Sequence, residues 1–328
     1  MIAPLERLAA NPLVRPSDIR FTQASGAFNA GATVDRATGK VVLLVRVFEQ
    51  DTRRSCLALA LSSDGMVIDE IRNEPAITRQ ETYEEWGVED ARITCLESEG
   101  RYAITYTGYS PAGPRVCLIT TDDLLAPERY RRHGPRMAGD NKNSVIFPER
   151  VEGQYVILHR PMPCIECIRV SSLEEEWRAN GVRLLGPQPG TWRSSRVGAG
   201  APPIRTRIGW LMAFHGATTI EEGNVYSMGW CVLDLDEPES VLYVSDVPAL
   251  VPEAEYEIEL NEIPQVDPAN FRNGVRVVFP QGLVEAGDDL IVYYGAADVS
   301  VAAARVNRGD LVDSLESAIG LHQGGVAL

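Results

Sequence analysis

The sequence has little positive charge and no long hydrophobic run. Its 328 residues include 31 Lys and Arg against 46 Asp and Glu, which gives a formal net charge of −15. Phosphate backbones are bound by basic surfaces, so this composition argues against a general nucleic-acid or anionic-membrane surface, although it allows a small local cationic pocket. No stretch approaches the roughly 18 apolar residues of a membrane span, and residues 1–20 contain no apolar run of signal-peptide length. We therefore expect a cytoplasmic protein without a nucleic-acid or membrane partner.

Residues that commonly bind metals are also sparse, with six Cys and four His in the whole chain. Cys164 and Cys167 form a CxxC, but no second pair or flanking histidine completes a zinc site. Most of the other cysteines lie in apolar, strand-like stretches. We expect buried thiols in a reducing compartment, with no metal and no cofactor.

What the sequence does contain is a long succession of short strand patterns. Runs such as GKVVLLVRVFE, RYAITYTGYS, IGWLMAFHGAT and DDLIVYYGAADVS are rich in Val, Ile, Tyr and Thr, and several alternate apolar with polar residues. The turn sequences SSDG, VEGQ and EAGDD separate such runs. Helical periodicity is confined to MIAPLERLAA and RGDLVDSLESAIG, so we predict short peripheral helices at the termini.

This pattern predicts an all-β protein, for which a large sandwich and a propeller are the two main solutions. The strands arrive in groups of about three or four per 50–60 residues, which favours a propeller because its blades are small sheets packed radially. No interdomain linker is evident. We predict a single domain over residues 1–328, with residues 1–20 and 307–328 as peripheral terminal segments.

Two sets of charged residues at predicted strand ends are candidates for a functional site. WGVEDARIT places Glu89, Asp90 and Arg92 within four positions of one another. The second set is cationic or potentially cationic in an otherwise acidic chain, and comprises Lys142, Arg160, Arg196 and His215. If the second set converged on one cavity, it would bind a small dianion, with Arg providing bidentate contacts. Taken singly, each residue also has an ordinary structural explanation.

The motifs resemble those of glycoside hydrolase family 130, which contains inverting β-mannoside phosphorylases and related β-mannosidases. The matching segments run nearly end to end and include FNAGATVDRATGKVVLLVRV, RSCLALALSSDG, GVEDARIT, NKNSVIFPERVEGQYVILHRP, RVGAGAPPIRTRIGWLMAFHG and YYGAAD. The resemblance implies a five-bladed β-propeller with its active site at the central channel. It also implies phosphorolysis of a β-mannoside to α-D-mannose 1-phosphate, with inorganic phosphate as co-substrate, and a homo-oligomer is the family expectation.

The resemblance further implies roles for matching residues. Asp90 matches the catalytic acid, which in family members reaches the glycosidic oxygen through the 3-hydroxyl of the bound mannose. The implied phosphate-binding residues are Lys142, Asn143, Arg160, Arg196 and His215. The implied sugar-side or channel-lining residues are Asn29, Arg54, Ser55, Asp64, Glu89, Arg92 and Asp298. Asp64 in SSDG is also a typical turn residue, and Arg92 is either a sugar contact or a structural one.

Two reactions remain open within this family. An inverting hydrolase needs a second carboxylate, roughly 6.5–9.5 Å from the first, to activate water. Phosphate is already an anionic nucleophile and needs a cationic cradle instead. The cationic residues therefore favour a phosphorylase, with an inverting β-mannosidase as the alternative and a noncatalytic carbohydrate-binding propeller as a third hypothesis. The bond cleaved is left open between β-1,2- and β-1,4-linked manno-oligosaccharides and mannosyl-glucose.

Three features depart from the family pattern. Ala91 stands where a proline is common, and Lys142 and Arg196 each exchange Arg and Lys relative to some relatives, which retains the charge but alters the geometry offered to phosphate. The segment 256–280 is longer than usual.

An acid at Asp90 must also keep its proton, which a charged Glu89 would favour and a nearby Arg92 would oppose.

Overall fold

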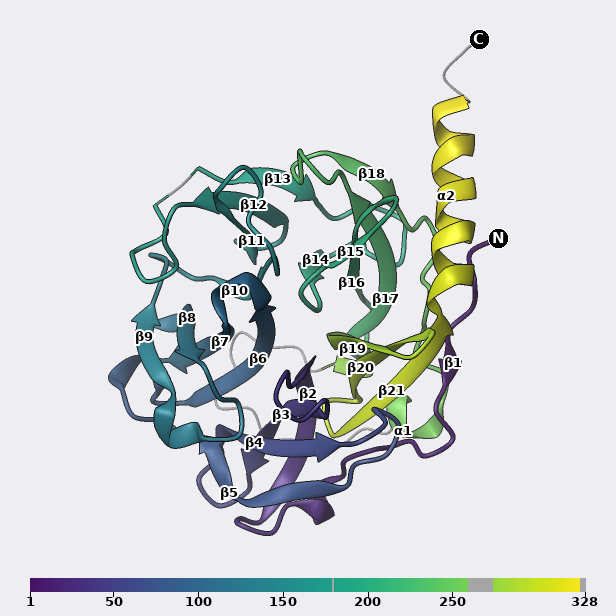
Figure 1. Cartoon of the computed structure of the whole chain (residues 1–328). Coiled ribbons are helices and arrows are strands. Elements are labelled where there is room, and N and C mark those ends of the chain that lie inside the picture. The colour runs from purple at the N-terminus through teal and green to yellow at the C-terminus, as the bar shows by residue number, and fades with distance from the viewer. Residues whose placement is uncertain (179, 259–273, 325–328) are drawn as a thin grey trace.

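The computed structural model describes residues 1–178, 180–258 and 274–324, and strands account for most of its regular structure. Figure 1 shows these strands arranged around a common centre, and the strands nearest to it are β2, β6, β10, β14 and β19. The prediction of an all-β protein is confirmed. Residues 259–273, within the unusually long segment noted above, lie outside the described residues.

The first half of the chain forms antiparallel groups of consecutive strands. The first group contains β2 (Ala24–Val34), β3 (Val41–Glu49), β4 (Arg54–Ser62) and β5 (Glu70–Ile77). The second contains β6 (Gly87–Leu96), β7 (Arg101–Ser110), β8 (Gly113–Thr121) and β9 (Arg131–Pro135). A parallel pairing of Ser55 with Gly87 joins these groups into one 8-stranded sheet.

The second half continues this arrangement. A 4-stranded sheet contains β10 (Lys142–Ile146), β11 (Tyr155–Arg160), β12 (Ile165–Val170) and β13 (Val182–Leu185). The next group contains β14 (Arg196–Ala199), β15 (Ile204–Thr206), β16 (Gly209–Thr219), β17 (Asn224–Leu233) and β18 (Val241–Val244). The last contains β19 (Gly274–Ala286), β20 (Asp289–Ala296), β21 (Ser300–Asn307) and β1 (Glu6–Arg7).

Neighbouring groups pack face to face through separate hydrophobic clusters. One cluster joins the first and second groups, and others join the second to the third, the third to the fourth, and the fourth to the last. A further cluster joins the last group to the first, with Tyr293 and Val301 buried beside Val45 and Ala58. Each group therefore packs against the next one, and the last packs against the first. The propeller and its number of blades stay predictions.

The N-terminal segment MIAPLERLAA forms no helix and contains the two-residue strand β1, so the helix predicted there is wrong. Glu6 pairs with Arg305 and Arg7 with Ala304, which makes β1 the outer strand of the last group. The partner strand lies at the far end of the sequence, where local periodicity cannot reveal it. The predicted C-terminal helix is confirmed as α2 (Arg308–Gly324), which Figure 1 shows extending away from the strands.

The remaining helical segments are short, and one predicted turn shows clear hairpin geometry. The short helices are η1 (Pro16–Asp18), η2 (Thr82–Glu84), η3 (Glu97–Glu99), η4 (Pro127–Arg129) and α1 (Glu255–Ile258). At VEGQ, Val151 and Gln154 exchange two backbone hydrogen bonds of 3.0 Å. Glu152 and Gly153 have φ of 52° and 78°, which is the type I′ geometry suited to a tight hairpin.

A buried glutamate anchors the connection that enters β6. Glu84 accepts backbone N–H groups from Gln80 and Glu81, at 2.8 and 3.2 Å, and the hydroxyl of Tyr106 at 2.6 Å. Arg132, on the outer strand β9, donates to it at 2.7 Å and to the carbonyl of Thr78 at 2.6 Å. One ion pair thus ties the periphery of the second group to the start of its innermost strand.

The same device recurs in the last group, before β19. Glu257 accepts the N–H groups of Glu253 and Ala254, at 2.8 and 2.9 Å, and the Tyr294 hydroxyl at 2.7 Å. Arg7, on the outer strand β1, donates to Glu257 at 2.8 Å and to the Val251 carbonyl at 2.6 Å. In both groups the tyrosine comes from the second strand and the arginine from the outermost one, as expected of repeated units.

Replacing Arg132 with alanine tests the first anchor. The substitution leaves Glu84 buried without its ion-pair partner, so we expect the free energy of unfolding to fall by about 3–5 kcal/mol. Urea denaturation measures this change. Arg131→Ala, at an exposed neighbour on the same strand, is the matched control and should stay within about 0.5 kcal/mol of wild type. Equal losses in the two variants would contradict the role of the anchor.

Candidate active site

Three innermost strands each present one polar residue from an irregular stretch of backbone. Asn29 on β2, Asp90 on β6 and Asn143 on β10 have φ of 48°, 52° and 54°. In each strand the register with its partner shifts at that residue. A β-bulge re-aims a side chain, and non-glycine residues in this conformation are uncommon. The bulges bring side chains from three separate groups of strands toward one another.

Arg46, on β3, joins the two carboxylates of GVEDARIT. Its guanidinium donates to Glu89 Oε1 at 2.7 Å and to Asp90 Oδ1 at 3.3 Å, and its Nε donates to Ser55 Oγ at 3.1 Å. Asn29 Nδ2 also donates to Asp90 Oδ1, at 3.0 Å. The structure therefore brings together Asn29, Ser55, Glu89 and Asp90, around an arginine that the sequence analysis did not single out.

The pKa values of the two neighbouring carboxyl groups are shifted in opposite directions. Burial raises the pKa of Glu89 above its usual value, although Arg46 opposes the shift. Burial acts in the same direction on Asp90, but Arg46, Arg92 and the hydrogen bond from Asn29 together outweigh it and lower the pKa of Asp90. The protein's own groups therefore favour a proton on Glu89 and a charge on Asp90.

Asp298 is a third carboxyl group in this region. It follows β20 with φ of 56° and is partly buried. Burial raises the pKa of Asp298 to about 6; Arg46 opposes this shift, and the negative charge of Asp90 adds to it. A carboxyl group that titrates near neutrality beside two others is characteristic of functional sites.

A second cluster surrounds His215, which is fully buried on β16. Arg160 and Asn143 both direct side-chain N–H groups at its Nε2, at 3.3 and 3.4 Å. Because both are donors, Nε2 must accept, and the ring proton lies on Nδ1. Burial and then Arg160 hold the pKa of His215 well below its usual value. His215 is therefore neutral, which corrects its inclusion among the potentially cationic groups.

Arg196 and Arg160 lie near the same aromatic cluster. Arg196 donates to Asn224 Oδ1 at 3.1 Å, and its guanidinium lies 5.8 Å from the centre of the Tyr226 ring. The ring of His215 lies 5.9 Å from that of Tyr226 and 4.2 Å from that of Phe279. Burial lowers the pKa of Arg160 to about 10, and the positive charge of Arg196 contributes to this shift. Arg160 therefore remains charged near neutral pH.

Lys142 lies between the acidic and cationic clusters. It stands opposite Arg160 in the ladder between β10 and β11. Burial and then Arg160 lower the pKa of Lys142 to about 8, whereas Glu89 and Asp90 act in the opposite direction. The site therefore places positive charge directly beside carboxylates, an arrangement that can hold a dianion close to an acid.

Arg92 is a structural brace rather than a free binding group. It is buried, and its guanidinium donates to the carbonyls of Asp90 and Gly200, at 2.7 and 3.1 Å, and to Asn143 Oδ1 at 3.3 Å. These bonds connect β6 to the start of the third group and to the chain after β14. The structure thus favours the structural alternative for Arg92.

Two predicted sugar-side residues are not brought into these clusters. Arg54 NH1 donates to the carbonyl of Arg53 at 3.4 Å. Asp64 is exposed in the turn after β4, where it accepts the N–H groups of Met66 and Val67 at 2.7 and 3.0 Å. Ser55 is at the start of β4, and nine extended residues span roughly 30 Å, so Asp64 is remote from the Arg46 cluster. We therefore leave Asp64 out of the candidate site.

Four residues at these clusters were not predicted from the sequence, namely Arg46, Gln281, Tyr226 and Phe279. For Arg46 a signal was available, because a lone arginine inside VVLLVRVF must find partners once the strand is buried. For Gln281 no local signal exists. Its Nε2 donates to the carbonyls of Asn29 and Ala91, at 2.6 and 2.9 Å, and both belong to strands distant in the sequence.

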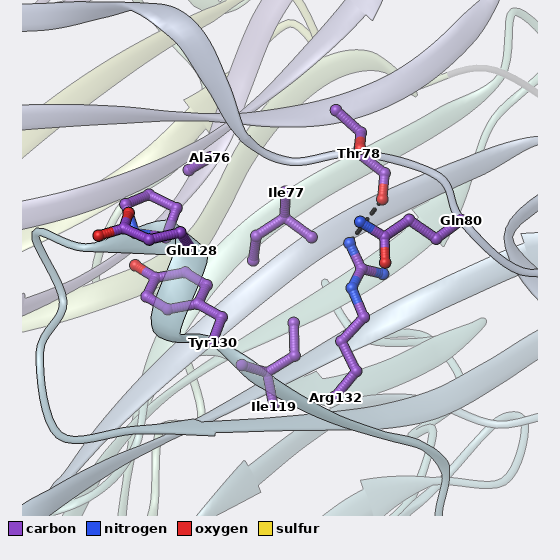
Figure 2. A pocket seen from close by; sticks show the side chains of 9 residues that line it. Ala76, Ile77, Thr78, Gln80, Ile119, Glu128, Tyr130 and Arg132 are labelled. Carbon is purple, nitrogen blue, oxygen red and sulfur yellow. Dashed lines mark hydrogen bonds between the residues drawn. The ribbon is translucent and has the colours of Figure 1, made fainter.

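A separate cavity of about 370 Å³ lies between the outer strands of the first two groups. Figure 2 shows Ile77 and Ile119 lining it, with Tyr130 on one side and Arg132 on the other. Arg132 is engaged by Glu84 and Thr78, as described above. This cavity shares no lining residue with the two clusters.

In residues 1–178, 180–258 and 274–324, no group of three or more His, Cys, Asp and Glu is arranged to hold a metal ion. In the same part of the chain, no helix has the length and apolarity needed to cross a membrane. The six cysteines are free thiols, and Cys164 and Cys167 are both buried.

Comparison with known proteins reveals relatives over nearly the whole chain. A family model described as beta-1,4-mannooligosaccharide phosphorylase matches residues 5–317. A 1,2-beta-oligomannan phosphorylase from Thermoanaerobacter sp. is 33% identical over 94% of this chain and 98% of its own length. A beta-1,2-mannobiose phosphorylase from Listeria innocua is 30% identical over 94% of this chain and 98% of its own. The solved structure of a Listeria innocua beta-1,2-mannobiose phosphorylase with beta-1,2-mannobiose superposes with a TM-score of 0.81 at 30% identity, covering 95% of this chain and 99% of that chain.

Replacing Asp298 with asparagine tests the raised pKa of this carboxyl group. Because the folded-state pKa, about 6, exceeds the ordinary value of 3.8, the associated stability is fully present below pH 3.8 and is lost as pH rises through 6. Asp298→Asn should therefore be more stable than wild type at pH 7–8, by about 1–3 kcal/mol after allowance for solvent screening. The difference should disappear near pH 4.

Urea denaturation across pH 4–8 measures this effect. Asp64→Asn is a control of opposite sign, because backbone N–H groups lower the pKa of Asp64. Its contribution is present above the ordinary pKa and is lost as pH falls through the lowered one. A pH-independent difference between Asp298→Asn and wild type would show that Asp298 titrates normally.

Proposed function

The chain belongs to glycoside hydrolase family 130, and on that premise we propose that it is an inverting β-mannoside phosphorylase. It cleaves a β-mannosidic bond with inorganic phosphate and releases α-D-mannose 1-phosphate, without a further cofactor. The observation that carries the proposal is the contact between a cationic and an acidic cluster. Lys142 and Arg160 form one side, with Arg196 near Arg160, and Asp90 lies on the other.

In the proposed reaction, an oxygen of phosphate forms a bond to the anomeric carbon as the bond from that carbon to the leaving oxygen breaks. Attack from the face opposite the leaving group inverts the anomeric configuration. The leaving oxygen takes a proton that originates from Asp90, relayed by the mannose 3-hydroxyl as expected for the family. The cationic side holds the nucleophile in line and offsets its repulsion from the carboxylates.

Bound phosphate also accounts for how Asp90 can act as an acid although its pKa is low in the free protein. Positive charge, chiefly from Arg46 and Arg92, opposes the effect of burial and keeps Asp90 ionised. A dianion bound at Arg160 and Lys142 offsets part of this positive charge and adds negative charge nearby, so it raises the pKa of Asp90. In this proposal the co-substrate both attacks the sugar and helps Asp90 retain its proton.

Among mannosides, we place β-1,2-linked manno-oligosaccharides first. Both curated relatives described above, at 30% and 33% identity, are named for β-1,2-linked substrates. The family model is described by a β-1,4-linked substrate, which is therefore the second choice. Mannosyl-glucose is the third.

The β-mannosidase alternative has one observation in its favour. Glu89 and Asp298 give Asp90 two carboxyl neighbours with raised pKa values, and a hydrolase needs a second carboxylate to activate water. The cationic cluster would have no evident use in hydrolysis. The requirement for phosphate separates the two reactions.

We further propose that the strand groups are the blades of a five-bladed propeller within a single domain. The hydrophobic cluster between the last and first groups supports a closed ring. The pairing of β1 with β21 supports closure by the N-terminal strand. The free, mostly buried thiols fit a reducing compartment such as the cytoplasm.

The first test is phosphate-dependent cleavage of β-1,2-mannobiose, measured as mannose 1-phosphate formation. Arg160→Ala should lower this rate about 10²–10³-fold, because it removes a buried cation from the nucleophile's site. Arg205→Ala is the control, since Arg205 is an exposed residue that pairs with Glu149. Equal release of mannose with and without phosphate would instead indicate the β-mannosidase. Panels of β-1,4-mannobiose and mannosyl-glucose identify the preferred bond.

The second test is the pH profile of mannoside cleavage at limiting and saturating phosphate. Activity requires protonated Asp90, so it falls as pH rises through the pKa of Asp90. If bound phosphate raises that pKa, the falling limb moves to higher pH at saturating phosphate. Identical limbs at the two phosphate concentrations would show that phosphate does not control the protonation of Asp90.

A further inference from the structure

We propose that Gln281 is a positioning residue for Asp90, acting together with Gly295 through Asn29. The inference rests on the proposed phosphorolysis at Asp90. Gln281 lies on β19, is fully buried, and stands where the register between β19 and β20 shifts. Its Nε2 donates to the carbonyls of Asn29 and Ala91, at 2.6 and 2.9 Å. Because both partners are carbonyl oxygens, both amide protons are used and the orientation of the amide is determined.

The two carbonyls belong to the bulges that aim Asn29 and Asp90. Asn29 and Asp90 have φ of 48° and 52°, and Ala91 directly follows Asp90. This conformation is strained for a residue other than glycine, and it persists only where the surroundings hold it. Gln281 binds both bulges at once, so one side chain from the last group fixes the backbone from which two site residues project.

The backbones of β2, β6 and β19 approach one another so closely here that a side chain would not fit between them. A side chain at Gly31, on β2, would place its Cβ 2.1 Å from the carbonyl oxygen of Ala91. A Cβ at Gly282, on β19, would lie 2.7 Å from that of Ala32. The strands β2, β6 and β19 therefore meet backbone to backbone, and a small displacement of β19 is transmitted to the other two.

The last group also orients the side chain of Asn29. Asn29 Nδ2 donates to Asp90 Oδ1 at 3.0 Å. On its other side, a Cβ at Gly295 on β20 would lie 1.9 Å from Asn29 Oδ1. Only glycine leaves room for the amide in this orientation. Gln281 thus holds the backbone of Asn29, and Gly295 gives its side chain the space to donate to Asp90.

If Gln281 positions Asp90, its loss should disturb the acid side of the site and leave the phosphate side unchanged. The hydrogen bond from Asn29 is among the causes that lower the pKa of Asp90. Loosening Asn29 therefore raises that pKa and misplaces the carboxyl group. The residues proposed to bind phosphate project from β10, β11, β14 and β16, which Gln281 does not contact through these hydrogen bonds.

The test compares Gln281→Met, which keeps length but loses both donors, with Gly295→Ala. We expect kcat for mannose 1-phosphate formation to fall between about tenfold and a hundredfold, as for small misplacements of a reacting group. The KM for phosphate should stay within about twofold of wild type, and the falling alkaline limb should move to higher pH. Gln188→Met, at an exposed glutamine, is the matched control and should behave as wild type.

Several outcomes would overturn the inference. One is a folded Gln281→Met with wild-type kcat and pH profile, and another is a loss of kcat matched by an equal rise in the KM for phosphate. Should Gln281→Met fail to fold, Gly295→Ala decides alone, since it removes no hydrogen-bonding group. Wild-type protein that forms no mannose 1-phosphate would instead overturn the proposed function, which keeps the two failures distinct.

Discussion

Asn29, Asp90 and Asn143 hold left-handed backbone conformations at bulges in three innermost strands, and the candidate site depends on this geometry. A regular strand would alternate its side chains between the two faces of each sheet. The bulges instead direct polar groups toward their counterparts on neighbouring groups of strands. The strained conformations persist because side chains from elsewhere in the ring hold them, with Gln281 gripping two of the bulges and Arg92 bracing the third.

The electrostatics of the site follow from this close approach. Carboxyl groups and guanidinium groups are buried together, and each shifts the pKa of its neighbours. Arg46 helps to keep Asp90 ionised, whereas burial raises the pKa of Glu89 and so favours its protonated form. His215 is neutral, so the positive charge comes from Lys142, Arg160 and Arg196. A bound dianion would complete this balance, which is why phosphate suits the site better than water.

The closure of the ring links this geometry to the rest of the molecule. The N-terminal strand β1 completes the last group, and Arg7 on that strand anchors Glu257 ahead of β19. An equivalent anchor at Glu84 precedes β6. Strand β6 therefore starts close to a buried ion pair that reaches outward to a peripheral strand. In the last group, the corresponding ion pair joins the peripheral strand β1 to the short helix α1.

Local sequence patterns were enough to predict an all-β protein, because strand alternation and turn chemistry act over a few residues. The motif GVEDARIT, with the other family segments, was enough to identify Asp90 and the cationic residues as candidates. Tertiary structure alone decided that the first residues form a strand, that His215 is neutral and that Asp64 is remote. It also revealed the roles of Arg46 and Gln281. Each of these depends on partners that are distant in the sequence and meet only when the ring closes.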